Sequence, residues 1–210
     1  MKIAVLGTGG VGSTLGTRWA AAGHHVVFGS RDPAHEKIRL LLERGGERTR
    51  VEPLRAATAD AEAIVNALPW LVTRETLTAL GDLRGRIVID CTNPLKPDMS
   101  GLDVPPGSSA AEQIASWLPG AHVVKAFNTA SARVMNDPNF GPQQATMFYC
   151  GDDAAAKETV QQLIADLGFE PVDAGPLVCA RYLESLAMFY IHLAFKQGWG
   201  SNCAIKMIKR

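Results

Sequence analysis

Short apolar runs alternate with segments of helical character along most of this chain of 210 residues. A short apolar run bounded by turn residues is typical of a strand buried in a parallel sheet, and apolar residues at helical spacing predict a helix that packs against it. We predict strands at residues 3–6, 26–28, 48–51, 63–68, 86–90, 122–127, 146–150 and 170–172. We predict helices at residues 10–22, 33–44, 56–61, 72–80, 109–118, 154–167 and 181–197. This alternation predicts an α/β fold.

The character of the sequence changes at the turn Gly175-Pro176. We therefore expect residues 1–175 to form the main α/β domain and residues 176–210 to form a small helical region. Residues 181–197 are apolar around most of the helix circumference, so this helix should be buried on several sides. It could close the substrate side of a crevice, join a dimer, or do both.

The first predicted strand leads into a glycine-rich turn, which leads directly into the first predicted helix. The turn consists of Gly7, Thr8, Gly9, Gly10, Val11 and Gly12. Strand, turn and helix together are the context in which G-x-G-x-x-G indicates a dinucleotide site. Gly7 permits the tight turn, Gly9 lets the backbone approach a pyrophosphate, and Gly12 lets the helix pack closely. The motif makes all six residues candidate cofactor ligands in a Rossmann-type, doubly wound, mostly parallel sheet.

The second predicted strand ends in Gly29-Ser30-Arg31, where the motif selects the cofactor. An NAD site usually carries an acidic residue here to bind the ribose 2′-hydroxyl, whereas an arginine accommodates a 2′-phosphate. Ser30 and Arg31 therefore favour NADP, because a planar guanidinium pairs well with phosphate. Asp32 is the nearest carboxylate, and Asp32-Pro33 fits a helix N-cap followed by proline at the first helical position.

Three of the predicted buried strands have candidate site residues at their carboxyl ends or in the turns that follow. The carboxyl ends of parallel strands form the ligand crevice of an open α/β sheet, so these turns are candidate contacts. They comprise Ala67, Leu68, Pro69, Thr92, Asn93, Asn128 and Thr129. Thr92 and Asn93 can bond the cofactor ribose or the nicotinamide amide. The alternative for these two is a polar turn before Pro94.

Two polar features have a structural interpretation beside a chemical one. Lys125 lies within an apolar strand, and it fits an acid for carbonyl or imine reduction about as well as a structural role. Ser109 precedes Glu112 by three residues. That spacing favours a capping box at the start of a helix over a catalytic role.

Composition excludes several classes of function. The 21 basic and 21 acidic residues balance, so no overall field would recruit nucleic acid. The four cysteines lack a C-x-x-C spacing, so we expect reduced thiols and no metal site. The N-terminus enters a strand at once, which predicts a cytoplasmic location. The longest apolar run, residues 186–195, is about half of what a membrane span needs, so we expect no membrane partner.

These features together resemble the NADP oxidoreductases that depend on the deazaflavin coenzyme F420, whose fold also occurs in the NADPH domain of the STEAP metalloreductases. The resemblance covers nearly the whole chain. Beyond the glycine turn it rests on Gly29-Ser30-Arg31, Asn93-Pro94, Ala126-Phe127-Asn128-Thr129, Asp173-Ala174-Gly175-Pro176 and Glu184-Ser185-Leu186. It implies NADP in the crevice, with Pro94 and Ala126 among its contacts. It also implies a homodimer, and hydride transfer between the nicotinamide and F420 or a flavin-type acceptor.

Within this resemblance we predict that Asn128 and Thr129 orient the nicotinamide or its partner. We assign no general base, because in hydride transfer between two rings the cofactors carry the chemistry. Archaeal members carry a histidine where this chain has Asn128, and the end of the chain from Gly198 to Cys203 also differs from theirs. Two alternatives are NADPH-dependent reduction of a small carbonyl or imine substrate, and NADP sensing without turnover. The carbonyl and imine reductases usually have a larger helical domain than residues 176–210 provide.

Overall fold

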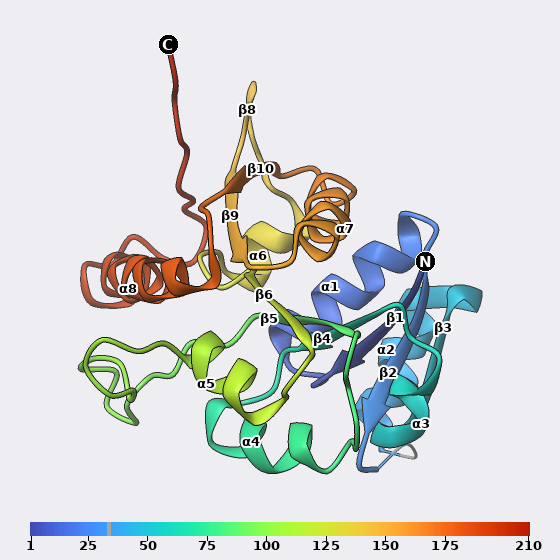
Figure 1. The fold of residues 1–210 in the computed structure, drawn as a ribbon. Coiled ribbons are helices and arrows are strands. Elements are labelled where there is room, and N and C mark those ends of the chain that lie inside the picture. The colour runs from blue at the N-terminus through green and yellow to red at the C-terminus, as the bar shows by residue number, and fades with distance from the viewer. Residues whose placement is uncertain (33–34) are drawn as a thin grey trace.

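The computed structural model of the chain describes residues 1–32 and 35–210. Its centre is an eight-stranded sheet with the strand order β10-β9-β6-β5-β4-β1-β2-β3 (Figure 1). Its strands are β1 (Lys2–Leu6), β2 (His25–Ser30), β3 (Thr49–Pro53), β4 (Ala63–Asn66), β5 (Ile87–Asp90), β6 (His122–Ala126), β9 (Thr146–Gly151) and β10 (Glu170–Asp173). Neighbouring strands pair in parallel except β6 and β9. The predicted doubly wound, mostly parallel sheet is therefore confirmed.

Helices cover both faces of this sheet (Figure 1). One hydrophobic core lies under α1, α6 and α7 and contains the fully buried Leu15, Val134 and Leu163. The other lies under α4, α5 and α8 and contains Leu77 and Ile114. The helices are α1 (Gly10–Ala21), α2 (Glu36–Gly45), α3 (Leu54–Ala59), α4 (Trp70–Thr78), α5 (Ala110–Trp117), α6 (Ala132–Asn136), α7 (Ala154–Ala165) and α8 (Ala180–Ile191).

A short helix and a short hairpin were not predicted from the sequence. Helix α6 follows β6, and its N-cap is Ser131, whose hydroxyl accepts a hydrogen bond from the backbone N–H of Val134. Strands β7 (Asn139–Phe140) and β8 (Gln143–Gln144) form an exposed hairpin beside the sheet. Elements this short show no period in their apolar residues, so the sequence pattern does not reveal them.

Asp32, the predicted helix N-cap, lies in the segment just after β2. The predicted place of Pro33 at the first helical position lies outside the described residues. Within them, α2 begins at Glu36. The backbone N–H of Asp32 donates to the Ser30 hydroxyl at 3.1 Å, so these residues form a local turn at the end of β2.

The C-terminal region follows β10 as a 3-10 turn (Leu177–Cys179), helix α8 and a π-helical segment (His192–Lys196). An extended tail comes last; it crosses the start of β9, where the N–H of Thr146 donates to the carbonyl of Ile205 at 2.9 Å. The very end of the chain projects away from the body of the molecule (Figure 1). Residues after 175 thus contain helix α8 and a π-helical segment, with a tail that was not predicted. The division into two regions at residue 175 stays a prediction.

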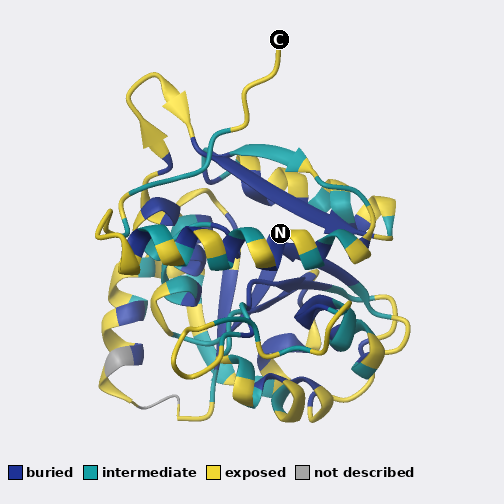
Figure 2. Cartoon of the chain, turned by 90° about the vertical axis from the view of Figure 1, so that its left-hand side faces the viewer, coloured by how far each residue is buried: buried dark blue, intermediate teal, exposed yellow. Residues whose placement is uncertain are grey.

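The continuous helical stretch Leu177–Lys196 has 20 residues and is, by length and composition alone, apolar enough to cross a membrane. The apolar run at 186–195 predicts a segment too short to span a membrane. This prediction about length was wrong, because the helix is longer than the run. In the folded chain 39% of the most apolar window is buried, and α8 packs against β9 and α5. Figure 2 views the side on which α8 lies and shows buried and exposed positions alternating along it. The cytoplasmic location and the lack of a membrane partner stay predictions.

Trp19 connects helix α1 to helix α7 and to the residue that follows β6. Its fully buried ring meets Phe127 edge-on, with the ring centroids 5.5 Å apart. Its indole N–H donates to the carbonyl of Leu163 at 2.9 Å, in the last turn of α7. The last carbonyls of a helix have no partner within the helix, so Trp19 satisfies one of them.

We expect Trp19→Phe to lower the free energy of unfolding by about 2–3 kcal/mol, through lost packing and an unpaired buried carbonyl. Urea denaturation followed by circular dichroism measures this loss. The matched control is Trp199→Phe, because Trp199 is 66% exposed and its replacement should change stability little. Equal effects of the two substitutions would contradict the role given to Trp19.

Candidate dinucleotide-binding site

A cavity of about 620 Å³ lies at the carboxyl ends of β1, β2 and β4. The structure places most of the predicted cofactor residues around it. These are Gly7, Thr8, Gly9, Gly10, Val11, Ser30, Arg31, Ala67, Leu68 and Pro69. Sequence reasoning missed an apolar part of the lining, made by Ile38, Leu54 and Val72 together with Thr76. Each is the inward residue of an amphipathic helix, a signal that marks burial but not a ligand.

The glycines shape the cavity through two close approaches of backbone to backbone. Gly7 has φ of +104°, and a Cβ there would lie 2.4 Å from the carbonyl oxygen of Ala67. A Cβ on Gly12 would lie 1.9 Å from the carbonyl oxygen of Gly7. Any side chain at either position would therefore push the turn away from β4 or α1 away from the turn.

Gly9 differs, because an added Cβ there would meet no atom within 4 Å. It is the N-cap of α1, and no side chain caps that helix. The N–H groups of the first helical turn therefore face the cavity without a side-chain acceptor, and together with the helix dipole they favour an anion. The residues fit a pyrophosphate in a space that a side chain at Gly9 would fill.

Ser30 and Arg31 lie at the other end of the cavity, where β2 ends. Both line it together with His35, and Arg31 is exposed. The guanidinium is thus accessible to a phosphate group from solvent, which fits the 2′-phosphate of NADP.

Gly12 lies in α1 against the Gly7 turn, and the remaining predicted residues lie outside this cavity, at the carboxyl ends of β5 and β6. The side-chain amide of Asn93 donates to the backbone carbonyl of Asn128 at 2.8 Å, and the Asn128 amide donates to the Asn93 side-chain oxygen at 3.1 Å. The Asn128 amide also donates to the carbonyl of Leu183 on α8 at 3.0 Å. Phe127, just before, has φ of +62°, a conformation rare for an aromatic residue. The two asparagines therefore connect α8 to the carboxyl ends of β5 and β6.

Several predicted site residues lie in the protein interior, among them Thr92 (5% exposed) and Asn128 (4% exposed). Ala126 is fully buried, and Pro94 is also buried. Thr129 is 2% exposed, and its hydroxyl has Met147 Sδ as its described partner at 3.9 Å. The parts predicted for these residues and for Asn128 in cofactor binding or orientation stay predictions.

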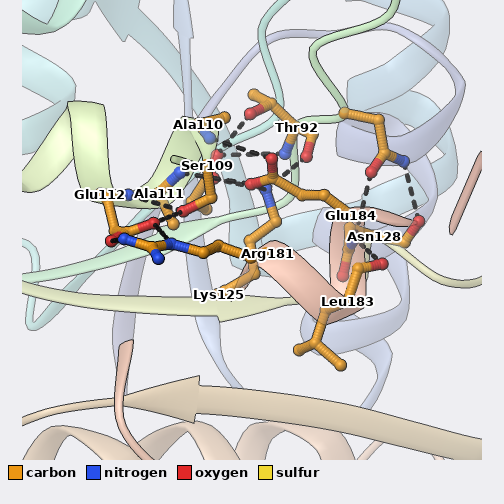
Figure 3. Close-up of polar contacts among 12 residues, drawn as sticks. Thr92, Ser109, Ala110, Ala111, Glu112, Lys125, Asn128, Arg181, Leu183 and Glu184 are labelled. Atoms are coloured by element: carbon orange, nitrogen blue, oxygen red, sulfur yellow. Dashed lines mark hydrogen bonds and ion pairs between the residues drawn. The ribbon is translucent and has the colours of Figure 1, made fainter. Parts of the chain in front are cut away.

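Lys125 forms a buried ionic cluster with Asp90 and Glu184. Figure 3 shows Lys125 with its partners Glu184 and Thr92. Its ammonium lies 2.8 Å from Asp90 Oδ2, 2.8 Å from Glu184 Oε1 and 2.6 Å from the carbonyl oxygen of Thr92. All three ionic side chains are 0% exposed. Since a protonated amine has three N–H donors and each is used, the structure favours the structural interpretation of Lys125 over that of a proton donor.

The surroundings of Lys125 oppose its loss of a proton. Burial by itself lowers the pKa of Lys125, but the negative charges of Asp90 and Glu184 outweigh burial and raise it. Burial raises the pKa of Glu184, and the charge of Lys125 and the N–H of Ala110 oppose that rise. Lys125 is thus held as an ammonium ion and is poorly suited to acid catalysis.

The capping box predicted at Ser109 is confirmed. The Ser109 hydroxyl accepts from the backbone N–H of Glu112 at 3.2 Å and donates to the Glu112 carboxylate at 2.7 Å. Arg181 of α8 pairs with the same carboxylate through two N–H groups, and this hydrogen bonding lowers the pKa of Glu112. A partly exposed ion pair therefore joins α5 to α8 beside the buried one.

The cysteines and carboxylates of the described residues form no metal site. Cys91, Cys150, Cys179 and Cys203 are free thiols, and burial raises the pKa of Cys150 to about 12. Within residues 1–32 and 35–210, no three His, Cys, Asp or Glu side chains are grouped to hold a metal ion.

Known proteins resemble the chain at the level of both sequence and fold. Residues 2–94 match the family model described as NADP oxidoreductase, coenzyme F420-dependent. The F420-dependent NADP reductase of Methanothermobacter marburgensis is 32% identical over 211 residues, with 93% of each chain covered. The metalloreductase STEAP3 of Rattus norvegicus is 34% identical, with 89% of this chain but 36% of the relative covered. The chain therefore spans about a third of that metalloreductase.

Solved structures agree. A protein from Arthrobacter sp. FB24, proposed to be an F420-dependent NADP reductase, superposes with a TM-score of 0.90 at 34% identity, with both chains covered completely. A reductive aminase from Aspergillus terreus in complex with NADPH superposes with a TM-score of 0.69 at 21% identity and covers 94% of this chain. At that identity the aminase shows a shared fold alone.

The fold and the cavity define a Rossmann-type protein with a candidate dinucleotide site. The similarity over the full length of a reductase narrows this class, and the chain belongs to the family of F420-dependent NADP oxidoreductases. It is an NADP-dependent enzyme by this membership, as the Ser30-Arg31 pair predicts.

We expect Gly9→Ala to weaken NADPH binding tenfold or more while leaving the melting temperature nearly unchanged. The added methyl group contacts no protein atom but enters the space assigned to the pyrophosphate. Titration of NADPH fluorescence measures the affinity. Gly23→Asn is a control outside the cavity, because Gly23 has φ of +102° and open space around it. Unchanged affinity in Gly9→Ala would contradict the assignment of the phosphate position.

Proposed function

We propose that this enzyme transfers hydride between NADP(H) and the ring of a deazaflavin or flavin-type acceptor. The proposal is supported by Lys125, whose buried ammonium uses all three of its N–H donors in hydrogen bonds and so is not free to protonate a substrate. It is also supported by the cavity, which suits NADP. When bound, the cofactor supplies the hydride and the two electrons of the reaction. The chain's own residues bind the cofactor and hold its nicotinamide end in place.

The proposed orientation follows from the strand order. Ser30 and Arg31 bind the 2′-phosphate, and the start of α1 binds the pyrophosphate. Because β4, β5 and β6 lie side by side, the nicotinamide half then extends from Pro69 toward the Thr92-Asn93 turn. Asn128 positions that turn through its amide pair with Asn93.

The acceptor is proposed from what the nicotinamide end offers. A carbonyl or imine that accepts hydride also needs a proton, whereas a deazaflavin or flavin ring needs little help from protein acids. In the described part of this region, Lys125, Asp90 and Glu184 are buried and hydrogen-bonded to one another or to the backbone. Helix α8, which begins at Ala180, covers this side and is proposed as the wall of the acceptor site.

NADPH oxidation at 340 nm tests this proposal, with F420, FMN, a ferric chelate and small ketones and imines as separate acceptors. We expect turnover with F420 or FMN and none with ketones or imines. Turnover with ketones or imines alone would instead support a carbonyl or imine reductase. NADPH binding without oxidation by any acceptor would support a sensor.

We expect Arg31→Ala to weaken NADPH binding about tenfold or more and NADH binding less than twofold, because only NADPH carries the phosphate that Arg31 pairs with. Fluorescence titration with both nucleotides measures the two affinities. Arg39→Ala is the matched control, since Arg39 is an exposed arginine of α2 that pairs with Glu43 and does not line the cavity. Equal loss of both nucleotides in Arg31→Ala would contradict the NADP assignment.

We further propose that the enzyme is a homodimer joined along α8. Large apolar side chains are exposed on α8 and on the turn just before it, among them Tyr182 (74%) and Phe189 (58%) on the helix and Val178 (42%) in the turn. They recur at helical spacing and form one stripe, which a second copy would bury.

In this dimer Phe189→Glu places a charge in the apolar interface, so we expect it to yield monomers. Light scattering after gel filtration measures the mass. Leu71→Glu is the control, because Leu71 is 84% exposed on α4, away from α8. A monomeric wild-type protein, or a Phe189→Glu variant that stays dimeric, would contradict this interface.

A further inference from the structure

We propose that the buried cluster of Asp90, Lys125 and Glu184 carries one net negative charge and, by that charge, makes the cofactor site favour NADP⁺ relative to NADPH. The proposal rests on the function proposed above, which puts the nicotinamide at the Thr92-Asn93 turn. It assigns to Glu184 and Asp90 an electrostatic part in the reaction, in addition to their part in folding.

The charge of the cluster follows from its hydrogen bonds. Glu184 accepts from three N–H donors: Lys125 Nζ (2.8 Å) and the backbone N–H groups of Ala110 (2.9 Å) and Ala111 (3.3 Å). A protonated carboxyl would turn a donor toward one of these donors, so the geometry fits the carboxylate. Two carboxylates and one ammonium then leave a net charge of minus one, provided that Asp90 is ionised too.

Asp90 meets that condition. Its Oδ1 accepts from Asn66 Nδ2 (3.0 Å), from the backbone N–H of Thr92 (3.1 Å) and from the Thr92 hydroxyl (2.8 Å). Its Oδ2 accepts from Lys125 (2.8 Å). A protonated carboxyl would turn its own hydrogen toward one of these four donors, so the geometry fits the carboxylate here too.

The position of the cluster gives this charge its effect. Asp90 bonds the N–H and hydroxyl of Thr92, while Lys125 bonds the Thr92 carbonyl at 2.6 Å, so the cluster lies directly against the turn beneath the proposed nicotinamide position. The cluster is 0% exposed, so salt and water screen it less than a surface charge. The N-terminal dipole of α5, which holds Glu184, offsets part of the charge but less than one unit.

The reaction changes the charge of the ring that faces this turn. The ring is neutral in NADPH, and when C4 gives up hydride with its two electrons to the acceptor the ring becomes a cation. A fixed negative charge stabilises the cation and leaves the neutral ring nearly unaffected. Through protein at an effective dielectric constant of about 20, one unit charge about 12–25 Å away changes an equilibrium by roughly ten- to threefold. At a shorter separation the opposing dipole of α5 reduces the effect, so we expect the same range.

The test is the ratio of the dissociation constants of NADP⁺ and NADPH, which needs no acceptor. We expect Glu184→Gln to raise this ratio three- to tenfold, because it removes one negative charge with little change in shape. Asp90→Asn should act in the same direction and replaces Glu184→Gln if that variant does not fold by circular dichroism. Adenosine 2′-phosphate 5′-diphosphoribose, which lacks the nicotinamide, should bind each variant as it binds the wild type.

Glu112→Gln is the matched control. It removes a carboxylate from the same contact between α5 and α8, but Glu112 is partly exposed and paired with Arg181, so the ratio should stay within twofold of wild type. A ratio that stays within twofold of wild type in the folded variants Glu184→Gln and Asp90→Asn would overturn the proposal, as would an equal change in Glu112→Gln. Failure of NADP⁺ and NADPH to bind wild type would instead refute the proposed function.

Discussion

The close approach of the Gly7 turn to α1 and β4 is the constraint on which the cofactor site depends. A Cβ at Gly12 would lie 1.9 Å from the Gly7 carbonyl, and one at Gly7 would lie 2.4 Å from the Ala67 carbonyl. Only glycine allows both contacts, so β1, the turn, α1 and β4 are held in one fixed arrangement. The start of α1 is thereby aimed at the crevice, where its N–H groups can bind phosphate.

The far end of the crevice depends on polar contacts instead. There the Asn93-Asn128 amide pair and the Lys125-Glu184 ion pair fasten α8, at the consecutive residues Leu183 and Glu184, to β5 and β6. A buried charge cluster is costly unless its hydrogen bonds are complete. Here they are complete for Lys125, so the fold fixes α8 over the carboxyl ends of β5 and β6 without leaving Lys125 free for proton transfer. The contacts that hold the proposed acceptor wall in place are therefore the ones to which we assign its electrostatics.

Much of the fold could be predicted from the sequence because each buried strand is a short apolar run. The glycine turn could be recognised because it lies between a strand and a helix. The direction of β9 could not, since an apolar run looks the same in a parallel or an antiparallel pair. The half of the site around Gly9 and Arg31 follows a local motif. The half around Lys125 does not, because its partners Asp90 and Glu184 are distant in sequence and only the fold brings them together. The sequence alone therefore leaves Lys125 with two interpretations, a proton donor or a structural residue, and its buried partners favour the second.

A crystal structure of the enzyme with bound NADP⁺ tests the proposed orientation of the cofactor. We expect the 2′-phosphate against Ser30 and Arg31, the pyrophosphate at the start of α1, and the nicotinamide beside the Thr92-Asn93 turn under α8. A cofactor bound in the reverse direction, or a nicotinamide held away from that turn, would contradict it.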